Sequence, residues 1–155
     1  MTRRTFLWTG TLALTYASTP HGVDAEQTGT ARRTAVTVYK DPNCGCCTLW
    51  GQHMEQAGFA MSYVNSSDLA AVRSKHRVPA SLQSCHTALV DGYVVEGHVP
   101  AADVRRLLAT KPKVAGIAVP GMPIGSPGME QGSRKQSYAV MSFDATGKTA
   151  VFAEH

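Results

Sequence analysis

The sequence predicts an α/β fold, and three observations support this prediction. Residues 34–39 alternate between polar and apolar side chains and are rich in β-branched residues, which is typical of a strand. Asn43 is a residue type that caps helices, and Gly58 stands where the following helix would end. Asp91-Gly92 between two apolar segments is a strong hairpin signal. The chain of 155 residues is long enough for one such domain and a targeting segment.

The expected elements follow one order along the chain. Strands are expected at residues 34–39, 59–64, 86–90 and 93–96, and helices at about 44–57, 65–76 and 100–108. Helices connect the first three strands and a hairpin connects the last two, which gives the order β-α-β-α-β-β-α. Pro100 is well placed to start the last helix. We therefore predict a thioredoxin-like domain over residues 34–110.

The remaining residues, 111–155, are expected to form a Gly/Pro/Met-rich loop and a C-terminal β-hairpin. Proline and glycine recur too often between residues 119 and 129 for a helix or a long strand. The apolar side chains in this segment favour a fixed, docked loop over a disordered one. Residues 137–143 and 148–153 flank a turn signal and are expected to pair. We expect this tail to pack on the same domain.

The first 25 residues are typical of an export signal. Arg3-Arg4 followed by Phe6-Leu7 is similar to the twin-arginine type, with an ordinary secretory leader as the alternative. Threonine and glycine interrupt the apolar stretch that follows, which argues against a permanent membrane anchor, since a spanning helix needs about 20 apolar residues. We expect a periplasmic protein that starts near residue 26, with residues 26–33 as a flexible linker.

Charge and composition argue against a nucleic-acid-binding role. The net charge is +4, and part of it lies in the expected export signal. The other basic residues are scattered and form no stripe interleaved with aromatic residues, as nucleic-acid-binding domains have.

Four cysteines, which are all the cysteines of the chain, carry the chemistry. Three of them lie within four positions, Cys44-Gly45-Cys46-Cys47, where the first strand is followed by the first helix. The outer pair is a C-x-x-C motif at the position of the redox motif of thioredoxin-like domains, with a third cysteine inserted. The helix N-terminus lowers thiol pKa values, which favours the thiolate form that binds metals. Because neighbouring thiolates repel each other, protons or a bound cation must offset their charge.

The fourth cysteine, Cys85, is expected to lie opposite the first three. In thioredoxin-like domains a short loop, usually with a cis-proline, leads into the third strand and faces the C-x-x-C motif. Alignment with this pattern places Cys85-His86 on the facing loop, with His86 at the position of the proline. Potential metal ligands thereby replace a substrate-docking residue, and the four sulfurs are expected to converge at one end of the sheet.

Copper as Cu(I), bound as one ion or as a polynuclear cluster, is the metal that these cysteines favour. Cu(I) is soft, accepts two or three sulfurs and shares thiolates readily. A single tetrahedral Zn²⁺ is an alternative, but adjacent Cys46 and Cys47 do not easily serve one ion together with Cys44. An iron–sulfur cluster is a further alternative, whose usual cysteine spacing fits poorly. Two structural disulfides are the alternative without a metal.

Four further side chains are candidates for the site, each with a structural alternative. His86 is a candidate ligand next to Cys85, and otherwise a hydrogen-bonded histidine at the start of a strand. His98 follows the fourth strand, and is otherwise a surface histidine. Met122 and Met129 offer thioethers to a soft metal, or else fill the core.

Four segments together resemble the CopG-like copper-resistance family, a group of small bacterial metal-binding proteins long described as a domain of unknown function. These segments are residues 39–47, 84–87, 91–100 and 119–129. The resemblance implies a thioredoxin-like fold, a periplasmic location, copper bound through the cysteines and a role in copper tolerance. A redox role that interconverts Cu(I) and Cu(II) is also suggested for such proteins.

The sequence thus predicts a periplasmic copper-binding protein for copper resistance, with copper at Cys44, Cys46, Cys47, Cys85 and His86. Storage, redox catalysis as a copper oxidoreductase, and transfer to a periplasmic copper-handling or redox partner all require the same ligands, so these roles stay open. The alternative function is a thiol–disulfide oxidoreductase that uses Cys44 and Cys47.

Overall fold

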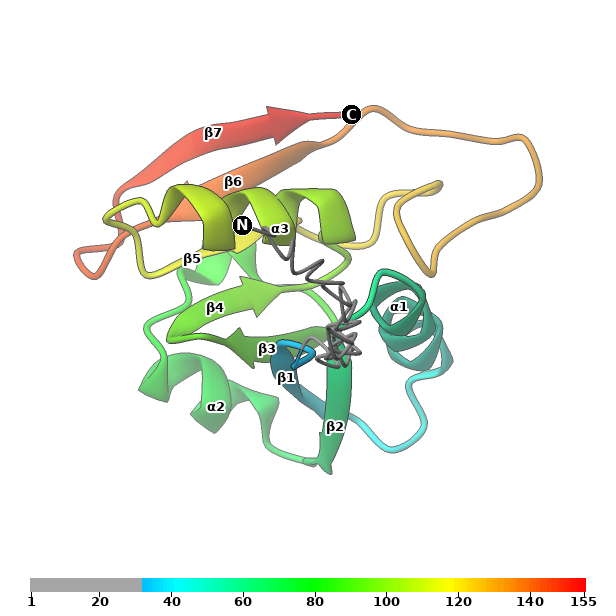
Figure 1. Ribbon diagram of the computed structural model, residues 1–155, viewed down its shortest axis with the longest axis horizontal. Coiled ribbons are helices and arrows are strands. Elements are labelled where there is room, and N and C mark those ends of the chain that lie inside the picture. The colour runs from blue at the N-terminus through cyan, green and yellow to red at the C-terminus, as the bar shows by residue number, and fades with distance from the viewer. Residues whose placement is uncertain (1–31) are drawn as a thin grey trace, which may run out of the picture. The chain divides into compact units, whose positions relative to one another are not determined.

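The computed structural model describes residues 32–155, so the predicted export signal and most of the predicted linker lie outside the described residues. Up to residue 110, its helices and strands follow the predicted order (Figure 1). The strands are β1 (Ala35–Lys40), β2 (Ala60–Asn65), β3 (His86–Val90), β4 (Tyr93–Glu96), β5 (Gly116–Ala118), β6 (Ala139–Phe143) and β7 (Thr149–Glu154). The helices are α1 (Gly45–Gln56), α2 (Leu69–Lys75), α3 (Ala101–Thr110) and a short 3₁₀ helix (Ala80–Leu82). Within the described range, no helix has both the length and the apolar character needed to cross a membrane.

Seven strands form one mixed sheet in the order β2-β1-β3-β4-β5-β6-β7. β1 pairs parallel with β2 and antiparallel with β3, and β3 pairs antiparallel with β4 through the predicted hairpin at Asp91-Gly92. This is the thioredoxin-like arrangement that the sequence predicts. Lys40, the last residue of β1, pairs with His86, the first residue of β3. The start of α1 and the segment before β3 therefore lie at the same end of the sheet.

The sheet continues into the tail, where the sequence analysis missed one strand. β5 pairs parallel with β4 and antiparallel with β6, and β6 pairs antiparallel with β7. The tail strands are therefore part of the central sheet. β5 has only three residues and begins with Gly116, which is an unusual residue in a strand. Glycine is required here because a Cβ atom would lie 2.3 Å from the Val94 carbonyl oxygen.

Hydrophobic side chains cover both faces of the sheet. On one face, Trp50 of α1 and Leu107 of α3 are fully buried in the larger core cluster. On the other face, Val78, just before the 3₁₀ helix, belongs to a smaller cluster. Successive strand residues point to opposite faces, so Val95 belongs to the larger cluster and Val94 to the smaller one. This burial fixes α1, and with it the three cysteines at its start.

The turn before α1 differs from the prediction that Asn43 caps the helix. Cys44 is the N-cap residue, and its side chain makes no capping hydrogen bond. The Asn43 N–H group instead donates to Asp41 Oδ1 at 2.8 Å, and the Cys44 N–H group donates to the Asp41 carbonyl oxygen at 3.0 Å. Asp41 therefore holds the turn, and the positive end of the α1 dipole lies beside the cysteine sulfurs.

Candidate metal centre

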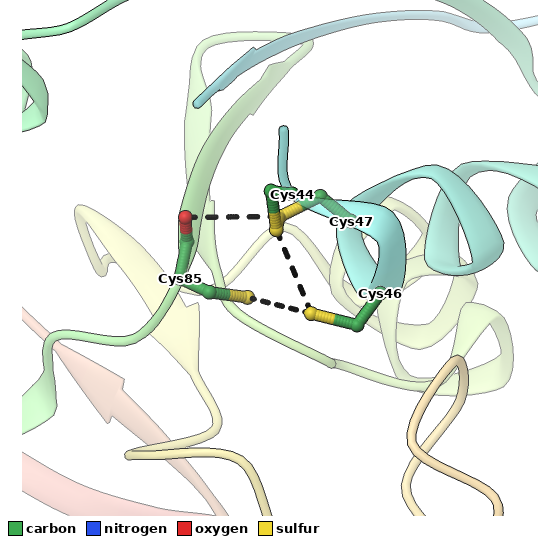
Figure 2. Close-up of side chains that lie close together, drawn as sticks. All are labelled: Cys44, Cys46, Cys47 and Cys85. Carbon is green, nitrogen blue, oxygen red and sulfur yellow. Dashed lines mark hydrogen bonds between the residues drawn. A yellow bond between two sulfur atoms is a disulfide. The ribbon is translucent and has the colours of Figure 1, made fainter. Parts of the chain in front are cut away.

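The four cysteine sulfurs meet at one end of the sheet, where the sequence predicts them (Figure 2). Cys44, Cys46 and Cys47 lie at the start of α1, and Cys85 lies immediately before β3. The four Sγ atoms all lie within 4.8 Å of one another. Residues 39 positions apart in the sequence thus share one site because β1 and β3 pair side by side.

Two of the four sulfurs are joined. Cys44 and Cys47 form a disulfide with a Cα–Cα distance of 5.4 Å, whereas Cys46 and Cys85 are free thiols. Cys46 Sγ lies 3.5 Å from Cys44 Sγ and 3.9 Å from Cys85 Sγ. Cys47 Sγ lies 3.8 Å from the Cys85 carbonyl oxygen, and only the reduced Cys47 thiol can donate a hydrogen bond to it. The sequence shows the C-x-x-C spacing but not this oxidation state.

Burial strongly perturbs the Cys85 thiol. Burial, followed by the neighbouring Cys46, raises the pKa of Cys85 to about 12. Without a cation nearby, Cys85 is therefore protonated at neutral pH. A bound metal ion would supply the positive charge that favours the thiolate.

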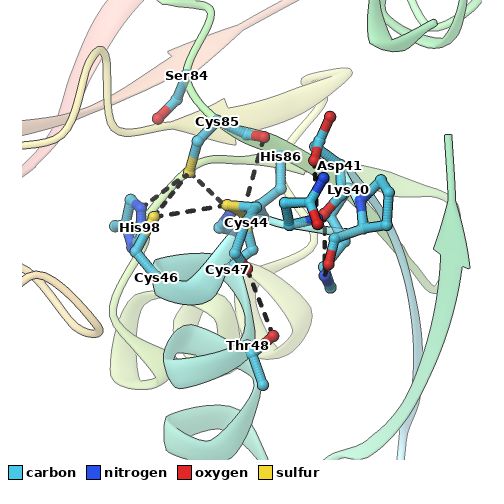
Figure 3. The surroundings of a disulfide bond; sticks show 12 residues. Lys40, Asp41, Cys44, Cys46, Cys47, Thr48, Ser84, Cys85, His86 and His98 are labelled. Carbon is cyan, nitrogen blue, oxygen red and sulfur yellow. Dashed lines mark hydrogen bonds between the residues drawn. A yellow bond between two sulfur atoms is a disulfide. The ribbon is translucent and has the colours of Figure 1, made fainter. Parts of the chain in front are cut away.

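His98 contacts the same thiol from the end of β4 (Figure 3). Its Nε2 atom lies 2.9 Å from Cys85 Sγ, and its Nδ1 atom lies 2.8 Å from the Pro127 carbonyl oxygen. Burial lowers the pKa of His98, so its ring is neutral. Because a carbonyl oxygen only accepts, the proton is on Nδ1 and the free lone pair on Nε2 faces Cys85. His98 is fully buried, so the alternative of a surface histidine is wrong.

His86 is a second buried imidazole in contact with Cys85. Its Nδ1 atom lies 3.3 Å from Cys85 Sγ, and its ring lies between those of Trp50 and His98, with centroid distances of 4.4 Å and 5.2 Å. Burial, and then the neighbouring His98 and Arg73, lower the pKa of His86 to about 3. The ring is therefore neutral, which is the form that binds metals. Its Nε2 atom is buried and has no hydrogen-bond partner among the described residues.

The Gly/Pro-rich loop docks on the site through its backbone. Besides the hydrogen bond from Pro127 to His98, Gly128 is packed so closely that a Cβ atom there would lie 2.8 Å from the Cys46 carbonyl oxygen. Met129 is partly buried, whereas Met122 is 52% exposed. A core-filling role is therefore wrong for Met122, and metal ligation by either methionine stays a prediction.

Lys40 supports the cysteine turn, and the sequence analysis did not single it out. Its Nζ atom donates to the carbonyl oxygens of Asp41 and Pro42, at 3.0 Å and 3.3 Å (Figure 3). Lys40 is only 7% exposed although it is charged. The signal in the sequence for this role is a lysine at the end of a strand, directly before the turn that leads into the C-x-x-C motif.

A buried ion pair behind Cys85 was also not anticipated. Glu96 at the end of β4 is fully buried, and its Oε1 atom lies 2.9 Å from Arg73 Nε of α2. Glu96 Oε1 accepts a hydrogen bond from the Ser84 N–H group at 2.8 Å, and Glu96 Oε2 accepts one from Thr87 Oγ1 at 2.5 Å. A glutamate directly after Val94-Val95, in a strand expected to be buried, is the signal that identifies it.

Two solved structures are similar to this chain over most of its length. Both are of a copper resistance protein CopG, in its form 1 and form 2, and each is 46% identical to this chain with a TM-score of 0.76. Each match covers 79% of this chain and 98% of the other. The chain belongs to the CopG family. The resemblance found in the sequence is therefore confirmed.

A sequence profile matches a shorter part of the chain. The profile DUF411, described as a protein of unknown function, matches residues 82–129. This segment contains Cys85, His86, His98 and the docked loop, but not the three cysteines of α1. No curated protein is similar enough to this CopG-family chain to count as a match.

The donor atoms of the site determine which ions fit it. Four sulfurs and two neutral imidazoles are soft to borderline ligands, and they suit Cu(I) or Zn²⁺ better than Ca²⁺ or Mg²⁺. Two overlapping groups share Cys85, namely the four cysteines and the set of Cys85, His86 and His98. The site can therefore present sulfur ligands alone or sulfur together with nitrogen.

Proposed function

We propose that this chain is a periplasmic copper-binding protein of copper resistance that holds Cu(I) at its cysteine cluster. The observation that carries the proposal is the convergence of four sulfurs within 4.8 Å, with two buried neutral imidazoles on Cys85. The similarity to two structures of a copper resistance protein supports copper as the metal. Holding Cu(I) in a partly buried thiolate site limits its reaction with oxidants and with other proteins.

The donor arrangement favours Cu(I) over Zn²⁺. A tetrahedral zinc site needs four ligands that point to one ion from separate directions. Cys46 and Cys47 are adjacent in the sequence, and Cys47 is fully buried whereas Cys46 is partly exposed. Neighbouring thiolates of this kind bridge several Cu(I) ions more readily than they chelate one zinc ion. We therefore propose a cluster with shared thiolates.

The oxidation state of the Cys44–Cys47 pair determines how many ligands the site offers. With this disulfide formed, Cys46 and Cys85 are the remaining thiols. Two electrons and two protons from a dithiol reductant convert the disulfide into two thiols. The reduced protein then offers four sulfurs, and we propose that it is the form that loads copper fully.

The same disulfide favours a second candidate function, a thiol–disulfide oxidoreductase. Cys44 and Cys47 occupy the C-x-x-C position at the start of α1 in a thioredoxin-like fold, and they are oxidised to each other. In that role the disulfide accepts two electrons from a substrate dithiol, which becomes a disulfide itself. Cys46 is not needed for this reaction.

The substitution Cys46→Ser separates the two functions. We expect the variant to lose most of its Cu(I) while Cys44 and Cys47 still form their disulfide. Copper content is measured after anaerobic loading of the reduced protein and desalting, with the neighbouring exposed Thr48→Ala as the control. Unchanged copper content in Cys46→Ser, together with fast reduction of insulin disulfides by the metal-free protein, would instead support the oxidoreductase.

We also propose export through the N-terminal segment, on the strength of Arg3-Arg4, the apolar stretch after it and the family resemblance. Cell fractionation and N-terminal sequencing test it. We expect periplasmic protein that begins near Glu26, and we expect Arg3→Lys combined with Arg4→Lys to retain the precursor in the cytoplasm. Periplasmic protein from the doubly substituted chain would favour an ordinary secretory leader.

A further inference from the structure

Ser84, the residue immediately before Cys85, has both of its backbone polar groups bound to one buried ion pair. Its N–H group donates to Glu96 Oε1 at 2.8 Å, and its carbonyl oxygen accepts from Arg73 Nη2 at 2.5 Å. Arg73 and Glu96 are also paired with each other at 2.9 Å. The two peptide groups on either side of Ser84 are therefore held by this pair, the preceding one through Glu96 and the one that links Ser84 to Cys85 through Arg73.

The pair reaches Ser84 from two different elements. Arg73 lies on α2, whose side chains are all exposed or only partly buried, yet the Arg73 side chain is just 12% exposed. Glu96 ends β4 and is fully buried, and its second oxygen is occupied by Thr87 of β3. A charged pair that is buried in this way needs all its hydrogen bonds. Removal of one partner leaves the charge of the other buried and unpaired.

The side chain of Ser84 is fixed as well. Its Oγ atom donates to the Gly121 carbonyl oxygen at the start of the docked loop. Gly97, which follows Glu96, has a φ of +71°, and a Cβ atom there would lie 2.5 Å from the Ser84 Cβ atom. Ser84 therefore contacts α2, the end of β4 and the loop at once.

We propose that Arg73 and Glu96 are positioning residues for the metal centre, which set the place of the Cys85 thiol relative to Cys46 and His98. Cys85 Sγ lies 3.9 Å from Cys46 Sγ and 2.9 Å from His98 Nε2, and both contacts depend on where the Ser84–Cys85 peptide is held. Metal sites tolerate displacements of only about 0.5 Å in their ligands. This inference rests on the proposed copper site. The hold of the Arg73–Glu96 pair on the Ser84 backbone, here called the clamp, can be tested with and without metal.

The substitutions are Glu96→Ala, which removes the clamp, and Glu96→Gln, which keeps its shape but removes the charge that holds Arg73. Glu96→Gln retains an oxygen acceptor for Ser84 and serves as the milder variant if Glu96→Ala fails to fold. Asp103→Asn is the matched control, because Asp103 of α3 is another buried carboxylate, which lies 3.7 Å from Arg106 Nη2 and 2.7 Å from His155 Nε2. Folding of every variant is checked by circular dichroism and thermal unfolding.

Two measurements decide the proposal. The first is Cu(I) affinity of the reduced full-length protein, by competition with a chromogenic Cu(I) chelator. Loss of a residue that orients a metal ligand weakens metal binding on the order of 10- to 100-fold, and we expect this range for the Glu96 variants and no change for Asp103→Asn. The second is the rate of alkylation of Cys85 by iodoacetamide in metal-free oxidised protein, with Cys46 of the same molecule as the reference. We expect the Cys85 rate to rise relative to that of Cys46.

A folded Glu96 variant with unchanged Cu(I) affinity and an unchanged ratio of the two alkylation rates would overturn the proposal. Equal losses of affinity in the Glu96 variants and in Asp103→Asn would also overturn it, because the effect would then follow stability alone. If the unsubstituted protein binds no Cu(I), the proposed function fails, while the alkylation ratio still tests the clamp.

Discussion

Cys85 Sγ lies 2.9 Å from His98 Nε2, and the Pro127 carbonyl oxygen holds the other nitrogen of the same ring at 2.8 Å. The Pro127 carbonyl oxygen thus sets the tautomer that directs a nitrogen lone pair at the thiol. Such backbone support of a histidine is common around metal sites, where it fixes the ring and raises its basicity.

The first prediction follows from this contact. We expect His98→Ala to weaken Cu(I) binding, on the order of tenfold or more, because the site loses a neutral nitrogen ligand or a support of Cys85. Competition with a Cu(I) chelator measures the change. His76→Ala, at the C-cap of α2, is the control and should bind Cu(I) as the unsubstituted protein does. Unchanged affinity in His98→Ala would show that His98 neither binds the metal nor supports Cys85 as a ligand.

The second prediction concerns the disulfide. Reduction turns Cys44 and Cys47 from a bonded pair into two ligands, so the reduced protein should bind more copper per chain than the oxidised protein. Anaerobic loading of both forms, followed by elemental analysis, measures this difference.

Two cysteine variants make the comparison specific. Cys47→Ser cannot form the disulfide with Cys44, so its copper content should depend less on prior oxidation than that of the unsubstituted protein. Cys85→Ser keeps the Cys44–Cys47 pair and should retain the dependence at a lower copper content. Equal copper content of the oxidised and reduced unsubstituted protein would show that the disulfide does not limit the site.

The third prediction uses Trp50 as a reporter of metal binding. Its ring centroid lies 4.4 Å from that of His86, and its indole N–H group donates to the Val99 carbonyl oxygen at 2.9 Å. We expect copper binding to quench the emission of Trp50, since the metal would lie near the indole ring. The chain has two tryptophans, and protein that begins near Glu26 contains only Trp50, because Trp8 lies in the proposed export signal. Emission that stays constant while copper binds would place the metal away from His86.

The fourth prediction concerns the docked loop. Gly128 has a φ of +85°, and a Cβ atom there would lie 2.7 Å from the Trp50 backbone nitrogen. Gly132 also has a positive φ, of +58°, but nothing lies within 4 Å of the position of its Cβ atom. Both alanine substitutions carry the backbone strain, so the difference between them isolates the packing of the loop on α1.

Overpacking of a tight contact typically costs about 1–3 kcal/mol, so Gly128→Ala should lower the free energy of unfolding by that much more than Gly132→Ala. Urea denaturation measures both free energies. Equal losses of stability would show that the loop is not packed against α1 as described.

The part of the site that the sequence predicted depends on fold topology. The thioredoxin-like order places the start of α1 and the start of β3 at one end of the sheet, so Cys44 and Cys85 were expected to meet despite their separation. The position of His98 near Cys85 is consistent with the same topology, since His98 lies just after β4, which pairs with β3. Alternation and turn signals were enough to identify these elements.

Other features have signals too short or too ambiguous to read in the sequence. β5 has three residues and begins with Gly116, so its pairing with β4 is decided by close backbone approach and not by strand propensity. The Cys44–Cys47 disulfide depends on oxidation as well as spacing. Glu96 is a charged residue in an apolar strand, and only its contacts with Ser84 and Arg73 show that it faces the loop before Cys85.

The most direct test of the proposed cluster is the copper content of protein purified from copper-supplemented cells, measured by elemental analysis alongside thiol titration. A Cu(I) cluster with shared thiolates predicts more than one copper per chain and no titratable thiols while copper is bound, with all four cysteines titrating once copper is removed. Protein without copper and with two disulfides would contradict the cluster and favour a thiol–disulfide or purely structural role for these cysteines.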